Sequence, residues 1–237
     1  MQTTFRHLPQ VQGWLNENAL LFTSFYKDNF LSSEVFDSLE IGVFHGKFFI
    51  GIENLTPRYG RCIAIDCFSH QESNIDGAGL GDLSIFTDNC QQFASDPKRV
   101  IAIEMDSLNI NAKDLGIGKF GIVSIDGCHT QFHTLNDLSA ARDLVSQQGV
   151  VILDDITNQD WMGVVSGASQ FFSSGQNGNL IPFAIGFNKL FCCHADFMEL
   201  VTQTIFEKTE FLLANQIRPT KWTEFMGYKV VSLHSDV

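Results

Sequence analysis

Acidic residues and a histidine follow two apolar runs of this sequence, at points where strands are expected to end. Asp126 and His129 come shortly after one run, and Asp154 and Asp155 come directly after the run Val150–Leu153. If both runs are parallel strands of one sheet, their carboxyl ends meet at the same rim and these side chains converge there. Crowded carboxylates are costly unless they are paired, hydrogen-bonded or bound to a cation. Three aspartates suit Mg²⁺, Mn²⁺ or Ca²⁺ better than zinc.

The same residues have a second interpretation that needs no metal ion. Asp126 can fix its own loop or bind an ammonium group of a ligand. Asp154 can cap the turn after its strand, and Asp155 can be solvated. His129 can be a general base, since an imidazole titrates near working pH, or it can be a hydrogen-bonded spacer. His133 is a weaker candidate for the base.

A glycine turn lies earlier in the chain, in the run Leu39–Gly46 (L-E-I-G-V-F-H-G), between an expected strand Val35–Val43 and an expected helix Lys47–Leu55. Glycines at such a turn allow the backbone to approach a cofactor, and the first N–H groups of the helix attract an anionic group. Asp66 lies in the next apolar run, Arg61–Phe68, about twenty residues after the turn, where a βαβ unit holds the ribose of an adenosine cofactor. The pattern predicts an adenosine-containing ligand.

The glycine spacing discriminates between cofactors. The dinucleotide fingerprint is G-x-G-x-x-G, and Phe44 stands at its second glycine, the one that lets a pyrophosphate approach the backbone. Phe44 therefore argues against NAD and FAD. A literal G-x-G-x-x-G at Gly116–Gly121 precedes an expected strand instead of following one, so we discard it. After a third run, Val100–Met105, Asp106 and Ser107 either meet an adenine amino group or form a helix cap.

Short apolar runs alternate with helix-like segments, which is typical of a doubly wound, mostly parallel sheet in an α/β fold. Further helices are expected over Asp82–Phe93, Thr134–Ser146, Val164–Ser173 and Asp196–Ala214. The runs Leu180–Ile185 and Lys189–Cys193 are separated only by Gly186-Phe187-Asn188, a hairpin spacing that predicts an antiparallel edge. A final run, Tyr228–Leu233, closes the chain.

Residues 1–34 are expected to form an N-terminal helical cap, and residues 35–237 the main domain. Val11–Phe30 has the pattern of an amphipathic helix, which either packs against the sheet or covers the substrate pocket as a lid. The polar, glycine-rich loop His70–Asp82 lies past the carboxyl end of the second strand. This loop either reaches the site or is only flexible.

The composition excludes several classes of protein. The chain has 237 residues, 44% hydrophobic and 18% charged, which suits one globular enzyme domain. A net charge of −12 without a Lys/Arg cluster argues against nucleic acid and favours a small-molecule partner. No apolar run reaches the roughly 18 residues that span a bilayer, and residues 1–9 lack a signal-peptide core, so we expect no membrane partner and a cytoplasmic location. A homo-oligomer remains an open alternative.

Several motifs together resemble one protein family. E-x-G-x-x-x-G at 40–46 resembles motif I of class I S-adenosylmethionine-dependent methyltransferases. The other motifs are similar to bacterial methyltransferase domain family 24 proteins: A-I-D-x-F-x-x-Q-x-x-N-I-D-G-x-G-x-G-D (64–82), S-I-D-G-C-H-T-x-x-H-T-L-N-D-L (124–138), G-V-V-I-L-D-D (149–155), W-x-G-V (161–164) and P-F-A-I-G-x-N-K-L-F (182–191). One departure is Gln147-Gln148-Gly149, where relatives usually have Pro-Gly-Gly.

The resemblance implies a Rossmann-like fold and assigns roles to the candidate residues. The implied residues for binding S-adenosyl-L-methionine are Glu40, Gly42, His45, Gly46, Asp66, Asp106, Ser107 and Asp126. The implied ligands of a divalent cation, Mg²⁺ or else Mn²⁺ or Ca²⁺, are Asp126, Asp154 and Asp155. His129 would be the catalytic base, with Asp126 beside it.

The reaction implied by this resemblance is transfer of the sulfonium methyl group to a hydroxyl oxygen of a small polar acceptor, such as a sugar or glycan precursor. Two alternatives come from other classes of protein. One is a nicotinamide-dependent oxidoreductase, and the other is a non-catalytic cofactor-binding module of a biosynthetic assembly. Fold alone does not decide between them.

Overall fold

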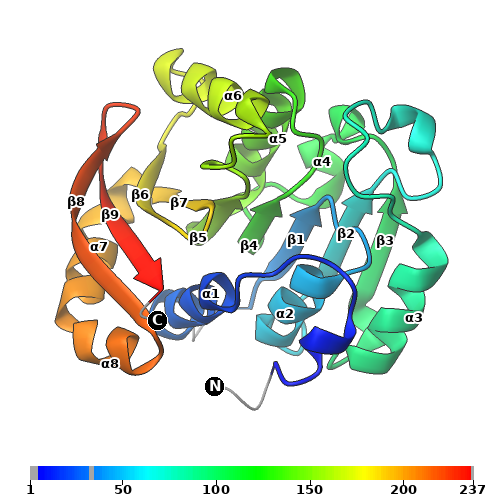
Figure 1. The fold of residues 1–237 in the computed structure, drawn as a ribbon, viewed down its shortest axis with the longest axis horizontal. Helices are drawn as coiled ribbons and strands as arrows, with labels where there is room; N and C mark the ends of the chain where they lie inside the picture. The colour runs from blue at the N-terminus through cyan, green and yellow to red at the C-terminus, as the bar shows by residue number, and fades with distance from the viewer. Residues whose placement is uncertain (1–4, 32–34, 236–237) are drawn as a thin grey trace.

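The computed structural model describes residues 5–31 and 35–235. These residues form a nine-stranded sheet in the order β3-β2-β1-β4-β5-β7-β6-β9-β8 (Figure 1). The strands are β1 Asp37–Ile41, β2 Cys62–Asp66, β3 Val100–Glu104, β4 Phe120–Ile125, β5 Val145–Leu153, β6 Leu180–Gly186, β7 Lys189–His194, β8 Ile217–Phe225 and β9 Tyr228–Ser235. β1 to β5 are parallel, whereas β7 is antiparallel to β5 and β6, and β8 is antiparallel to β9. The expected mostly parallel sheet with antiparallel strands towards one edge is confirmed.

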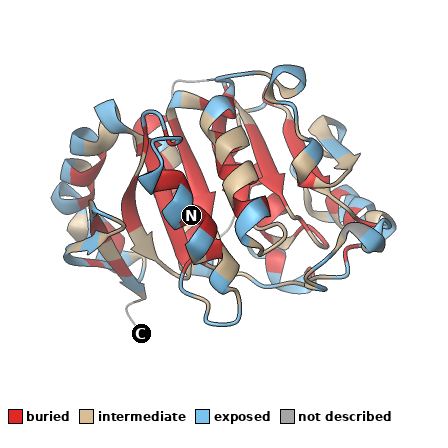
Figure 2. Cartoon of the chain, turned by 90° about the horizontal axis from the view of Figure 1, so that it is seen from above, coloured by how far each residue is buried: buried red, intermediate tan, exposed pale blue. Residues whose placement is uncertain are grey.

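The centre of the sheet is buried because its strands are continuous apolar runs. Every residue of β4 is buried, and so are the last five residues of β5 (Figure 2). A parallel strand that is covered on both faces needs apolar side chains in both directions. The edge strands β3 and β8 are much more exposed.

Helices cover both faces of the sheet, so it is doubly wound as expected (Figure 1). They are α1 Glu17–Phe30, α2 Lys47–Leu55, α3 Leu83–Phe93, α4 Ala112–Leu115, α5 Gln131–Leu144, α6 Met162–Ser173, α7 Met198–Glu207 and α8 Thr209–Ala214. One apolar cluster joins α1, α2, α3 and α7 to one face, and a second joins α5 and α6 to the other. Among the helices of the described ranges, none combines the length and apolarity needed to cross a bilayer.

After a 3-10 turn at Leu8–Gln10, the N-terminal segment is α-helical only from Glu17 onward. The expected helix Val11–Phe30 therefore starts too early, because the side chain of Asn16 caps α1 by accepting a backbone N–H of its first turn. α1 packs on the sheet, and the hydroxyl of Tyr26 donates to the backbone oxygen of Gln148 at 3.0 Å. The boundary expected after residue 34 falls at residues 32–34, which lie outside the described residues.

Two helices in the second half differ from expectation. The helix expected at Thr134–Ser146 starts at Gln131, because Thr130 accepts the N–H of His133 as an N-cap. It ends at Leu144, where β5 begins directly. The helix expected at Asp196–Ala214 is a short 3-10 turn followed by α7 and α8, which are separated at Lys208.

β8 was not predicted. Its sequence, I-R-P-T-K-W-T-E-F, is mostly polar and contains Pro219. Such a strand is tolerated at a sheet edge, where one side of the backbone needs no strand partner. β8 pairs with β9 and ends the sheet.

Candidate active site

A cavity of about 1010 Å³ opens beyond the carboxyl ends of β1, β2, β4 and β5. In open α/β sheets this is the side where ligands bind. Most of the predicted site residues line this cavity: Glu40, Gly42, Asp66, Asp106, Ser107, Asp126, His129, Asp154 and Asp155. The fold therefore brings together acids from five different segments of the chain.

His45 and Gly46 are the predicted site residues that do not line the cavity. The His45 ring is buried and stacks on Phe44, with the ring centroids 3.7 Å apart. Gly46 has φ +90° and is the N-cap of α2. Both residues belong to the turn between β1 and α2 without lining the cavity, so we expect them to affect a ligand through the conformation of the turn.

Position 42 must be a glycine, because the backbone that follows β4 leaves no room for a side chain there. Gly42 has φ +78°, and a Cβ at this position would lie 2.0 Å from the backbone oxygen of Asp126. The ends of β1 and β4 are further joined by the N–H of Asp126, which donates to the oxygen of Ile41 at 2.7 Å. The glycine thus permits close approach of two backbones within the protein.

Asp66 fixes the turn between β1 and α2. Its Oδ2 accepts the N–H groups of Val43 and Phe44 at 2.8 and 2.9 Å, and its Oδ1 accepts the N–H of Phe68 at 2.8 Å. These bonds hold Phe44 at φ +50°, a conformation that is rare for a bulky residue. Asp66 therefore has a structural role besides the ribose-binding role predicted for it.

Asp106 and Ser107 line the cavity beyond β3. The Oδ1 of Asp106 accepts the N–H of Leu108 at 2.9 Å, so the helix-cap interpretation is confirmed for this residue. Nε2 of His133 lies 3.5 Å from the same oxygen. The cap leaves the other carboxylate oxygen of Asp106 available to a ligand.

Glu40 is a buried carboxyl group with an unused oxygen. Its Oε1 accepts the hydroxyl of Ser124 at 3.1 Å, whereas Oε2 has no partner among the described atoms. Burial raises the pKa of Glu40 to about 8, and the charge of Lys189 offsets only part of this effect. A cationic group of a ligand would satisfy the orphaned oxygen.

His129 is held between two carboxylates, those of Asp76 and Asp155. Its Nδ1 lies 2.8 Å from Oδ2 of Asp76, and its Nε2 lies 2.9 Å from Oδ2 of Asp155. The ring also stacks on Trp161, with centroids 4.3 Å apart. Burial lowers the pKa of His129, but the hydrogen bonds to Asp155 and Asp76 outweigh burial and raise it above its usual value.

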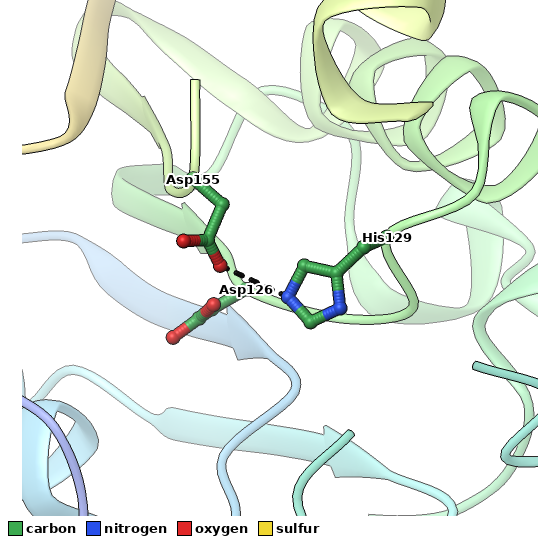
Figure 3. Close-up of side chains that lie close together, drawn as sticks. All are labelled: Asp126, His129 and Asp155. Atoms are coloured by element: carbon green, nitrogen blue, oxygen red, sulfur yellow. Dashed lines mark ion pairs between the residues drawn. The ribbon is translucent and has the colours of Figure 1, made fainter. Parts of the chain in front are cut away.

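Asp126, His129 and Asp155 form a group that could hold a metal ion, since one ligand atom of each lies within 4.8 Å of the others (Figure 3). Burial, followed by the charge of Asp154, raises the pKa of Asp126 well above its usual range. A bound cation would favour the ionised carboxylate. Asp154 is outside this group and forms an ion pair with Lys189.

The sequence interpretation missed three residues of this site. Lys189 is the first residue of β7, and its side chain is 5% exposed. The signal for it was a lysine at the start of an otherwise apolar strand. Asp76 and Trp161 belong to motifs used for the resemblance, but their contacts with His129 cross long stretches of sequence.

Solved structures with a similar fold include several methyltransferases. The O-methyltransferase NovP aligns with a TM-score of 0.60 at 13% identity, over 75% of this chain and 79% of NovP. CalS11, a TDP-rhamnose 3'-O-methyltransferase of calicheamicin biosynthesis, gives 0.51 at 14% identity, over 74% of this chain and 78% of CalS11. MycE, a methyltransferase of the mycinamycin pathway solved with Mg, SAH and mycinamycin VI, gives 0.52 at 18% identity, over 77% of this chain and 50% of MycE. At these identities the likeness establishes the fold.

The fold, the cavity and the sequence match together define a class I S-adenosylmethionine-dependent methyltransferase. Residues 39–156 match the methyltransferase domain family anticipated from the motifs, and this part of the chain belongs to that family. The matched region runs from β1 to the residues just after Asp155, so it contains the glycine turn and the strand-end acids. No curated protein matches the sequence.

Proposed function

We propose that the protein transfers the methyl group of S-adenosyl-L-methionine to a hydroxyl oxygen of a small polar acceptor, such as a sugar or glycan precursor. The observation that carries this proposal is the environment of His129. Its ring is oriented by Asp76 and lines the cavity beside the carboxylates of Asp126 and Asp155. An imidazole at this place can take the proton of an acceptor hydroxyl.

The cavity has groups suited to each part of the cofactor. The orphaned oxygen of buried Glu40 fits the ammonium group of the methionine moiety. Asp66 at the end of β2 fits the ribose hydroxyls, and Asp106 with Ser107 beyond β3 fits the adenine amino group. When bound, the cofactor supplies an activated methyl group. The protein's contribution is then to position the acceptor and remove its proton.

In the proposed mechanism, Nε2 of His129 accepts the proton of the acceptor hydroxyl. Nε2 faces Asp155 in the structure, so the hydroxyl would replace this carboxylate as its partner. Asp76 remains hydrogen-bonded to Nδ1 and stabilises the imidazolium that forms. The stacked ring of Trp161 restricts rotation of the imidazole. Asp76 and Trp161 thus hold the imidazole of His129 in one orientation.

The strand-end acids fit a divalent cation, and we propose Asp126 and Asp155 as its carboxylate ligands. The resemblance also implies Asp154, but in the structure this residue forms an ion pair with Lys189. A hard cation there would supply positive charge that favours the ionised form of an acceptor hydroxyl. The presence of Mg in the MycE structure supports this proposal.

The acceptor class is supported by the neighbours and by the cavity lining. CalS11 acts on TDP-rhamnose, and MycE was solved with mycinamycin VI. The cavity combines carboxylates and amides with Trp14 and Trp161, group types that suit the hydroxyls and the apolar face of a sugar ring. The net charge of −12 disfavours polyanionic partners such as nucleic acid, and we expect no membrane partner.

We also propose that residues 1–34 act as a cap over the domain at 35–237. Two contacts support this proposal. Residues Gly13–Asn16 line the cavity, and the side chain of Lys47 in α2 donates to the backbone oxygen of Gly13 at 3.0 Å. Packing of α1 against the sheet would anchor the segment that covers the acceptor.

The test is methyl transfer to a panel of sugars and nucleotide sugars. His129→Ala is expected to lower the rate by about 10²- to 10⁴-fold, which is typical for loss of a general base, without weakening binding of S-adenosylhomocysteine. His70→Ala, a change of an exposed histidine outside the cavity lining, should keep the wild-type rate. An unchanged rate in His129→Ala would contradict the proposed role of His129. Failure to bind S-adenosylhomocysteine would contradict the proposed function.

A further inference from the structure

Lys189 is a buried cation that the proposed reaction does not use. It opens β7 directly after the hairpin turn at residues 187–188. β5 and β7 are antiparallel, with Leu153 opposite Leu190. The next pair in this register brings Lys189 to Asp154 at the cavity end of the sheet. The ion pair is therefore fixed by the strand pairing.

The ammonium group of Lys189 lies in acidic surroundings at the cavity wall, and its side chain is only 5% exposed. Nζ of Lys189 forms an ion pair with Oδ2 of Asp154 and lies 4.7 Å from the centroid of the Phe48 ring. Lys189 is thus a fixed positive charge within the acidic end of the cavity.

The positive charge of Lys189 gives Asp154 a different environment from that of Asp126 and Asp155. Asp126 and Asp155 belong to the group whose ligand atoms lie within 4.8 Å of one another. Asp154 is bound on both oxygens, since Oδ1 accepts the N–H of Asp155 at 2.8 Å and Oδ2 pairs with Lys189. A divalent ion that recruited Asp154 would have to approach the ammonium group or displace it. Like charges repel strongly where the side chains are little exposed to water, and a buried charge that loses its partner is costly.

We propose that Lys189 is a built-in counter-cation that reserves Asp154, so that a divalent cation binds through Asp126 and Asp155 with an affinity that Lys189 limits. The inference rests on the proposed function of this site, but it concerns cation binding and can be measured without methyl transfer. One consequence is that Lys189 partly neutralises the negative charge of the strand-end aspartates.

Titration of Mn²⁺ into the full chain tests the proposal by a double-mutant cycle. Lys189→Gln is expected to bind Mn²⁺ at least about ten-fold more tightly than wild type, because Asp154 becomes available as a ligand. Asp154→Asn should cost much more affinity in the Lys189→Gln background than in wild type. No tightening in Lys189→Gln, or an equal cost in both backgrounds, overturns the proposal.

Lys189→Arg is the matched control, since it keeps a positive charge beside Asp154 and should tighten Mn²⁺ binding much less than Lys189→Gln does. If circular dichroism shows that Lys189→Gln does not fold, Asp154→Asn and Asp155→Asn in the wild-type background decide. A smaller loss of Mn²⁺ affinity in Asp154→Asn supports the proposal, and an equal or larger loss overturns it. Titration of S-adenosylhomocysteine into wild type is the separate readout of the proposed function, so the two failures are distinguishable.

Discussion

His129 illustrates how neighbouring carboxylates set the charge of a single side chain. An isolated imidazole would become harder to protonate on burial, yet Asp76 and Asp155 raise the pKa of His129. Burial raises the pKa of Asp76, but hydrogen bonds from His129 and Ala78 outweigh burial and lower it. The pair therefore favours imidazolium and carboxylate together. The neutral base becomes more abundant as the pH rises.

We expect activity to increase with pH through the pKa of His129, because only the neutral imidazole can accept a proton. Asp76→Asn removes a charge that favours the imidazolium, so the pKa of His129 should fall and the rising limb of kcat/KM should shift to lower pH. The measurement is kcat/KM between about pH 5 and pH 9.

Asp82→Asn is a suitable control for the pH profile. Asp82 lies on the same loop, but its Oδ1 accepts the N–H groups of Ser84 and Ile85 at the start of α3. The rising limb of kcat/KM in Asp82→Asn should therefore stay at the same pH as in wild type. If Asp76→Asn leaves the limb unshifted, His129 is not the titrating base.

The turn between β1 and α2 depends on contacts from elements that are distant in the sequence. Asp66 at the end of β2 accepts the N–H groups of Val43 and Phe44, and the backbone of Asp126 beyond β4 leaves no room for a Cβ at Gly42. The glycine that resembles a cofactor motif is therefore also a condition for packing the central strands. We therefore expect replacement of Gly42 to show first as a loss of folding stability.

Gly42→Ala is expected to lower the free energy of unfolding by at least about 3 kcal/mol, because backbone strain at positive φ adds to a collision with the backbone of Asp126. Gly175→Ala is the matched control, since Gly175 has φ +74° with nothing within 4 Å of an added Cβ. Strain alone should cost about 1 kcal/mol there. Urea denaturation measures the free energy of unfolding of both variants. Equal losses in the two variants would show that the backbone moves to relieve the collision.

In the molecule as a whole, most apolar contacts that stabilise the fold lie apart from the acidic groups that could take part in chemistry. Apolar clusters on the two faces of the sheet hold the helices, whereas the carboxyl ends of the strands carry acids around an open cavity. We expect the cavity-lining turn and loops to unfold together with these clusters. A ligand that binds only the folded state should therefore stabilise the entire domain.

S-adenosylhomocysteine at about one hundred times its Kd should stabilise the fold by about 2.7 kcal/mol, which raises the Tm of a domain of this size by about 5 to 10 °C. NAD⁺ at the same concentration should leave Tm unchanged, because Phe44 occupies the place of the glycine that a pyrophosphate needs. Thermal unfolding followed by circular dichroism measures both. A shift with NAD⁺ alone would favour the oxidoreductase alternative.

The elements that were predicted correctly are those with a strong local signal. The central parallel strands are continuous apolar runs, and the β6–β7 hairpin has a short connection, so both could be recognised from the sequence. β8 was missed because its polar residues and Pro219 give no periodic pattern, and it is a strand only because β9 pairs with it. The division of α7 from α8 at Lys208 likewise had no clear sequence signal.

The sequence by itself determined which chemical groups stand at the strand ends, because parallel strands with apolar runs place the residues after them at one rim. Asp66, Asp126 and Asp155 reached the cavity for this reason. Only the tertiary structure decided which of these groups are paired. The contacts of Asp76 with His129 and of Lys189 with Asp154 join separate segments of the chain. Such pairs depend on strand register and loop course, which no local pattern of residues specifies.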